Sequence, residues 1–151
     1  MPPPSFRHLG DDAEEEAPHL PLGRSLNTVV GIDNNTHHLS LANAVSDAHT
    51  ILKLFQRCGF EELAGAPSLF DEQATLDALT SLVRDQLPAE LQPEDSLVIF
   101  YAGHGATVSS KVPDPEDAGK TITRRTGYLI PVDARVEKSS DWLRLQQIQI
   151  W

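Results

Sequence analysis

A histidine stands between two glycines directly after an apolar run. Residues 96–102 read Ser-Leu-Val-Ile-Phe-Tyr-Ala, and Gly103, His104 and Gly105 follow. The run is too short for an ordinary helix, and its composition predicts a strand buried on both faces. Chemistry in open α/β sheets collects at the carboxyl ends of strands, and flanking glycines let a substrate approach closely. The pattern fits a catalytic histidine, and it also fits an exposed histidine in a plain strand-to-loop turn.

The elements before this segment alternate between strands and helices. Helical spacing and capping signals predict the helices, and β-branched runs predict the strands. We expect a strand at 26–32, a helix at 43–58, a short strand at 68–70, and a helix that Thr75 caps and Pro88 ends. This order predicts a right-handed βαβ arrangement with a mostly parallel central sheet.

The residues after the histidine are harder to assign. Residues 106–126 lack periodicity, which predicts a long loop bordering a substrate cleft at the same end of the sheet. Residues 127–133 predict an edge or terminating strand, because Pro131 cannot donate to a ladder. Residues 140–151 show apolar positions at helical spacing and predict an amphipathic helix.

Length and charge limit the classes of function. The chain has 151 residues and a formal net charge of −10, with a pI near 4.9. This charge argues against a nucleic-acid or anionic-membrane partner, and no apolar run approaches the roughly 18 residues of a membrane span. Residues 1–24 predict a disordered acidic, proline-rich leader, and residues 25–151 a single domain. With no signal peptide and one cysteine, we expect a cytoplasmic protein.

Two familiar catalytic motifs are missing. Gly119-Lys120-Thr121 suggests a phosphate-binding loop, but Asp114 stands where that motif needs its first glycine. No Gly-x-Ser-x-Gly elbow is present, so a serine hydrolase would lack its nucleophile. Neither nucleotide binding nor serine hydrolysis is favoured.

Histidines and the cysteine outside the main motif suggest little chemistry. His37, His38 and His49 lack a Cys or carboxylate to complete a tetrahedral metal site, so we expect exposed side chains and no metal. Cys58 follows the packed face of the helix at 43–58, which predicts a buried and unreactive thiol.

Four segments in order resemble the caspase and metacaspase family of His/Cys endopeptidases. The most specific is 100–105, Phe-Tyr-Ala-Gly-His-Gly. The segments 41–48, 73–75 and 127–133 resemble the family's first-helix signature and its later landmarks. The resemblance covers roughly residues 26–135 and is closer to the metacaspase-like branch than to animal caspases. It implies a three-layer α/β/α sandwich, and a role in programmed cell death.

The resemblance implies a cysteine-type endopeptidase that acts on protein or peptide substrates. His104 would be the general acid/base, and the N–H of Gly105 would stabilise the oxyanion. Animal caspases carry an arginine before the first helix, where this chain reads Ser40-Leu41. The resemblance therefore favours cleavage after Arg or Lys over cleavage after Asp. It implies no organic cofactor and no assignable metal ligand, although some metacaspases are activated by calcium.

The family's nucleophile has no counterpart in this sequence. It stands roughly 50 residues after the histidine, and counting from His104 passes Trp151. Cys58 precedes the histidine and lies on a predicted helix. We expect a caspase-like domain truncated before its nucleophile strand, inactive as written, and with an unpaired apolar sheet edge. The alternatives are a non-catalytic caspase-like module that self-associates or pairs with a relative, and an unrelated doubly wound binding domain.

Overall fold

The structure, a computed structural model, describes residues 23–117 and 119–148. The predicted leader falls almost wholly outside these residues. The helices and strands in chain order are β1 (Ser25–Gly31), α1 (Ala44–Arg57), β2 (Glu61–Glu62), β3 (Leu69–Phe70), α2 (Leu76–Ser81), the π-helical η2 (Leu82–Gln86), α3 (Leu87–Glu90), β4 (Ser96–Ala102), β5 (Gly105–Pro113), β6 (Thr121–Leu129) and β7 (Leu143–Arg144). The 3₁₀ turns are η1 (Asp71–Gln73), η3 (Ser139–Asp141) and η4 (Leu145–Ile148).

A parallel four-stranded sheet forms the body of the molecule. β1 pairs with β4 along its full length, from Ser25 opposite Ser96 to Gly31 opposite Ala102. On its other edge β1 pairs with β2 near its start and with β3 near its end, both parallel. The strands predicted at 26–32, 68–70 and 96–102 and their parallel pairing are confirmed, whereas β2 was not predicted.

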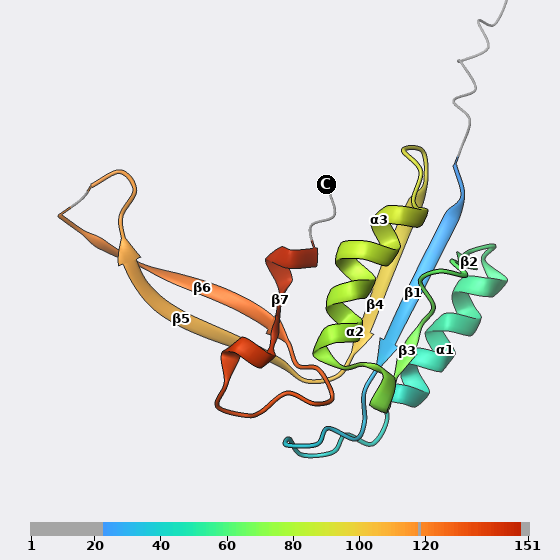
Figure 1. Cartoon of the computed structure of the whole chain (residues 1–151), viewed down its shortest axis with the longest axis horizontal. Helices are drawn as coiled ribbons and strands as arrows, with labels where there is room; N and C mark the ends of the chain where they lie inside the picture. The colour runs from blue at the N-terminus through green and yellow to red at the C-terminus, as the bar shows by residue number, and fades with distance from the viewer. Residues whose placement is uncertain (1–22, 118, 149–151) are drawn as a thin grey trace, which may run out of the picture.

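Helices cover both faces of this sheet, as Figure 1 shows. α1 lies so close to one face that a Cβ added at Gly31 would stand 2.7 Å from the Cβ of Ala48, so this position needs glycine. On the other face, leucines from α2, η2 and α3 pack on Leu26 and Val30 of β1. The result is the predicted three-layer α/β/α sandwich, and burial of its apolar side chains supplies the main driving force for folding.

The second helical segment begins as predicted and ends later. The Thr75 side chain accepts from the backbone N–H of Ala78 at 3.2 Å and caps α2. The prediction that Pro88 ends the helix is wrong, because the helical chain continues to Glu90. Pro88 falls in the first turn of α3, directly after the π-helical turn. A proline is tolerated in a first helical turn, where its missing N–H is not needed.

Residues 105–129 form a long antiparallel hairpin, which we call the arm. β5 and β6 pair over nine positions, from Gly105 opposite Leu129 to Pro113 opposite Thr121. The prediction of a loop at 106–126 is wrong. The arm projects away from the sandwich (Figure 1), so its strands pair with each other without burying a face. The alternation of apolar and polar residues, which is the usual signature of a strand, is therefore weak in the sequence and is broken at Ser110 and Arg124.

The segment after the arm folds back on the body. The prediction of an edge strand at 127–133 is wrong, because residues 127–129 are the last part of β6, which lies between β5 and β7 and ends at Leu129. The predicted helix at 140–151 is wrong where the structure describes it, because 3₁₀ turns flank the two-residue β7 at residues 143–144. Residues 149–151 lie outside the described part of the chain.

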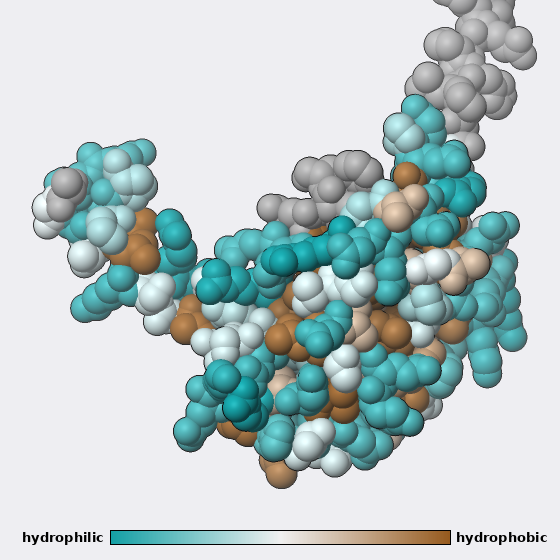
Figure 2. Space-filling view, viewed as in Figure 1, coloured by the Kyte–Doolittle hydropathy of each residue, from teal (hydrophilic) through white to brown (hydrophobic). Residues whose placement is uncertain are grey.

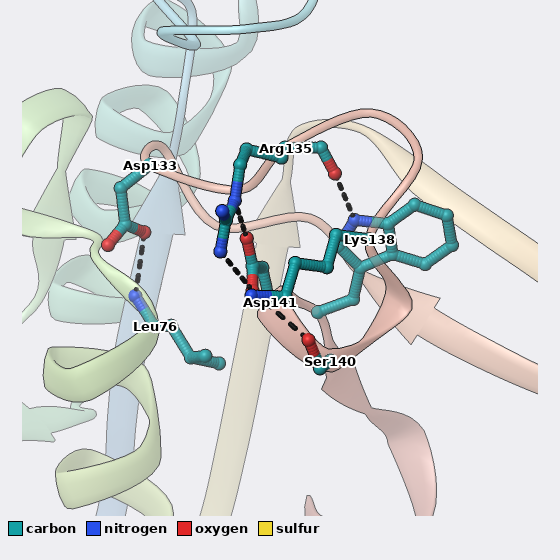
Figure 3. Close-up of polar contacts among 7 residues, drawn as sticks. Leu76, Asp133, Arg135, Lys138, Ser140 and Asp141 are labelled. Carbon is teal, nitrogen blue, oxygen red and sulfur yellow. Dashed lines mark hydrogen bonds and ion pairs between the residues drawn. The ribbon is translucent and has the colours of Figure 1, made fainter.

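Polar contacts hold this returning segment in place, as Figure 3 shows. The Asp133 carboxylate accepts from the N–H of Leu76 at 2.9 Å and ties the segment to the start of α2. Arg135 donates to both carboxylate oxygens of Asp141, at 2.5 and 3.1 Å. The indole of Trp142 donates to the Arg135 carbonyl at 2.9 Å. These contacts set the path between β6 and β7.

One edge of the parallel sheet has no neighbour among the described residues. β4 pairs with β1 alone. An apolar groove of about 640 Å³ runs beside it, with Leu97, Ile99 and Ile148 among its lining residues. The expected unpaired apolar edge is therefore present in the part of the chain that the structure describes.

Candidate active site

His104 lies in the short connection between β4 and β5, at the carboxyl end of the parallel sheet. Its carbonyl oxygen accepts from the N–H of Ile130 at 3.0 Å. The Tyr101 hydroxyl stands 3.0 Å from the same oxygen and 2.9 Å from the Ile130 carbonyl, and it donates toward both. A Cβ added at Gly103 would lie 2.7 Å from the Tyr101 hydroxyl. The glycine and the tyrosine together fix the backbone that carries the histidine.

Burial raises the pKa of Tyr101 well above its ordinary value, against a smaller lowering by its bond to Ile130. The hydroxyl therefore keeps its proton and remains a donor throughout the physiological range. The peptide at His104 does not change its hydrogen bonding with pH in that range.

The imidazole of His104 has one defined partner. Its Nε2 lies 2.6 Å from the carbonyl oxygen of Leu39. Since a carbonyl oxygen can only accept, this contact requires the proton to be on Nε2. In the neutral ring, Nδ1 is then the nitrogen with a free lone pair, able to take a proton from a nucleophile.

The loop between β1 and α1 presents the Leu39 carbonyl. The Asp71 carboxylate accepts from the N–H groups of Asp33 and Asn34, at 2.8 and 3.0 Å. The N–H of Leu41 in turn donates to the Asp33 carbonyl at 2.8 Å. Asp71 adopts φ +42°, an uncommon left-handed conformation that aspartate tolerates better than most residues. These contacts shape the loop around the carbonyl that His104 meets.

A second histidine accompanies the first. The rings of His38 and His104 lie 5.6 Å apart between centroids, tilted by 32°. His38 is half-buried, and its Nε2 is buried with no partner among the described residues. Burial, and then the neighbouring His104 and His37, lower the pKa of His38. The expectation that this side chain is exposed is wrong.

The N–H of Gly105 points away from the arm's partner strand. Paired residues of an antiparallel ladder alternate between bonded and non-bonded pairs. Because Ile130 donates to His104, the next pair, Gly105 and Leu129, is non-bonded. The N–H of Gly105, the residue after His104, is therefore available as a donor, as an oxyanion donor must be.

Cys58 is at the other end of the sheet. It caps the C-terminus of α1, three residues before Glu61, which pairs with Leu26 at the start of β1. His104 follows the strand end where Ala102 pairs with Gly31. Five residues of strand, about 17 Å, separate the two ends. The thiol is also exposed, so the prediction of a buried thiol is wrong.

No metal centre is visible in the described part of the chain. Between residues 23 and 148, apart from residue 118, no three His, Cys, Asp or Glu side chains gather in a way that could hold an ion. His37 and His49 are exposed as expected. In the same range, no helix has the length and apolar character needed to cross a bilayer.

Sequence reasoning named part of this arrangement. The predicted His104 and Gly105, which are consecutive in the chain, lie at the carboxyl end of the sheet. It adds Leu39, His38 and Tyr101, which the sequence analysis missed as site residues. Leu39 takes part through its backbone, which no side-chain pattern reveals, whereas Tyr101 stands inside the histidine motif itself.

Comparison with known families gives one match over most of the chain. The family model described as "Caspase domain" matches residues 24–149. No curated protein matches the chain.

Proposed function

The chain belongs to the caspase-domain family, and we propose that it contributes the acid/base half of a cysteine endopeptidase site. The observation that carries the proposal is the 2.6 Å contact between His104 Nε2 and the Leu39 carbonyl. It leaves the free lone pair on Nδ1, and the next residue in the chain, Gly105, has an N–H that makes no bond to β6. The thiolate must come from a polypeptide segment outside these 151 residues, since their one cysteine lies at the opposite end of the sheet.

The proposed reaction is acyl transfer followed by hydrolysis. His104 takes the thiol proton, and the thiolate attacks the scissile carbonyl carbon to form a C–S bond. The Gly105 N–H stabilises the resulting oxyanion. His104 then gives its proton to the leaving nitrogen as the C–N bond breaks, and later activates the water that cleaves the thioester. A thiolate and an imidazole complete this chemistry without a metal or an organic cofactor. The reducing cytoplasm suits such a thiolate.

The substrate we propose is a protein cut after Arg or Lys. No arginine stands where animal caspases grip aspartate, and the chain carries a net charge of −10. An acidic surface raises the local concentration of basic substrates.

The decisive experiment reads the coding sequence past the Trp151 codon and assays the complete product. If a cysteine follows, fluorogenic peptides ending in Arg, Lys or Asp report cleavage. His104→Ala should lower kcat by about 10²–10⁴-fold with an unchanged unfolding curve. The exposed His49→Ala is the matched control and should retain full activity. Retained activity in His104→Ala would overturn the assignment.

A second candidate function is a non-catalytic module. The observation that favours it is the free edge of β4 beside an apolar groove, combined with the distant Cys58. A reading frame without a second cysteine would reject the peptidase for this polypeptide acting alone. Co-elution of this chain with a caspase-domain relative on gel filtration would then support pairing, and a monomeric profile would reject it.

A further inference from the structure

The arm has a charge of its own. Its two strands hold Lys111, Arg124 and Arg125 and no acidic residue, although the whole chain has a net charge of −10. All three cations are exposed. None forms an ion pair with another described residue, whereas Lys120 at the tip of the arm pairs with Asp117. The strands of the arm are thus basic on an acidic protein, and the acidic residues of the arm, Asp114, Glu116 and Asp117, are confined to its tip.

Strand register sorts these side chains onto two faces. Ser109 lies opposite Arg125 and Lys111 opposite Thr123, so Lys111 and Arg125 are diagonal neighbours on one face. The opposite face carries Arg124, which pairs with Ser110, together with Val108 and Ile122, which are 36% and 40% exposed. Figure 2 shows brown, apolar residues on the arm between hydrophilic ones. One face carries two of the three cations, and the other combines apolar side chains with Arg124.

The outer edge of β5 is free along its length. Within the described residues, β5 pairs with β6 alone, while β7 covers only the Tyr128–Leu129 end of β6. Because Gly105 belongs to a non-bonded pair, every second residue from it also turns its N–H outward. These donors belong to Gly105, Thr107, Ser109 and Lys111. Pro113 stands at the next such position, where its missing N–H breaks no bond to β6.

We propose that the arm docks an extended protein segment whose acidic and apolar residues alternate, added as a third strand on the free edge of β5. Side chains of an added strand alternate between the two faces. Carboxylates would then lie over Lys111 and Arg125, and the intervening apolar side chains over Val108. The sheet edge supplies the affinity through main-chain bonds, and the two faces supply the specificity.

The position of β5 connects this surface to the candidate active site. The strand begins at Gly105, one residue after His104. Lys111 lies six residues further, about 20 Å along the strand. If the docked segment is a substrate, which rests on the proposed function, its acidic residues stand about six residues from the cleaved bond. Docking itself needs no catalytic cysteine.

Binding of labelled peptides to the 151-residue chain, followed by fluorescence anisotropy, tests the proposal. The probe is a twelve-residue peptide of alternating Asp and Val, compared with three matched peptides. One replaces Asp by Asn, one scrambles the alternation, and one carries backbone N-methyl groups at every second residue. We expect the probe to bind about tenfold more tightly than each of the others.

Two pairs of variants localise the binding. Lys111→Glu with Arg125→Glu should weaken binding about tenfold. Lys53→Glu with Arg57→Glu on the exposed side of α1 changes the net charge equally and should have little effect. Ser109→Pro removes one outward N–H and should weaken binding, whereas Ser109→Ala should not.

Several outcomes would overturn the proposal. Equal binding of the scrambled or N-methylated peptide would show simple charge attraction without strand addition. Equal losses in the two double variants would show a net-charge effect. Preferential binding of a DNA duplex would indicate a different partner, and concentration-dependent dimerisation that Ser109→Pro abolishes would show that a second copy occupies the edge. Each of these results leaves the test of His104 untouched.

Discussion

The two sheets of this molecule use strands in opposite ways. In the parallel sheet, β1 is almost wholly buried and helices cover both faces, so packing and strand pairing support each other. In the arm, β5 and β6 pair over nine positions while most of their residues stay exposed. The parallel sheet is stabilised by the helices packed on it. The arm depends on the hydrogen bonds between β5 and β6 and on its attachment to the body of the molecule. In this chain the packed parallel sheet positions the candidate active site, and a separate, mostly exposed hairpin extends from that site.

The largest expected contrast is between apolar truncations in the two regions. Leu87 in α3 is fully buried in the core. Leu87→Ala should lower the free energy of unfolding by about 3 kcal/mol, because it removes buried methyl groups and leaves a cavity. Val108→Ala on the arm should cost at most about 0.5 kcal/mol. Urea unfolding measures both values, and similar losses would show that the arm is packed against something in solution.

A smaller effect is expected where the arm joins the body. Tyr101→Phe removes the hydroxyl that donates toward the carbonyl oxygens of His104 and Ile130. The loss should be about 1–2 kcal/mol, since the Ile130 carbonyl would be left without that donor. Amide NMR shifts should change at Gly105 and along the arm more than in β1.

Tyr128→Phe is the matched control for that variant. Tyr128 is buried, whereas Tyr101 is half-buried, and the Tyr128 hydroxyl has no hydrogen bond to a described residue. Its removal should cost less than about 0.5 kcal/mol. Equal losses in the two variants would contradict the positioning role of Tyr101.

The smallest expected contrast between the two regions is in how the stability contributed by an ion pair changes with pH. The Arg24 guanidinium lowers the pKa of Asp95 to about 2, helped by the N–H of Gln92. A depressed pKa stabilises the fold above the unfolded value near 4, and this contribution is lost as pH falls through about 2. Asp95→Asn should therefore unfold at lower urea concentration than the wild type at pH 6, and the gap should close toward pH 2.

The matched acid on the arm is Asp117, whose pKa Lys120 lowers. That ion pair is exposed, and such pairs contribute little to stability. Asp117→Asn should leave the urea midpoint nearly unchanged from pH 6 to pH 2. A pH-dependent gap as large as that of Asp95→Asn would show that the arm shares the stability of the body.

The sequence predicted the regions in which periodicity and burial coincide. β4, α1 and the cap at Thr75 were expected because apolar spacing and capping chemistry are local. The arm was missed because neither of its faces is buried, although Thr, Val and Ile recur in both strands and favour extended chain. Cys58 was misjudged because it stands at the cap of α1, where the packed stripe of the helix ends.

The candidate site likewise contains residues that the sequence predicts and residues that it does not. His104 and Gly105 follow from a short motif. The proximity of His38 depends on a loop whose path is set by residues remote in sequence, such as Asp71. No spacing rule connects those positions.

The contact at the Leu39 carbonyl affects how this site can vary. A main-chain oxygen belongs to every residue type, and the Leu39 side chain is 86% exposed, so position 39 is free to change its side chain without altering the tautomer of His104. The constraint falls instead on Asp71, 32 positions later, whose carboxylate and unusual backbone hold the loop. Substitutions that disable the histidine can therefore occur far from it, at a position that never touches it.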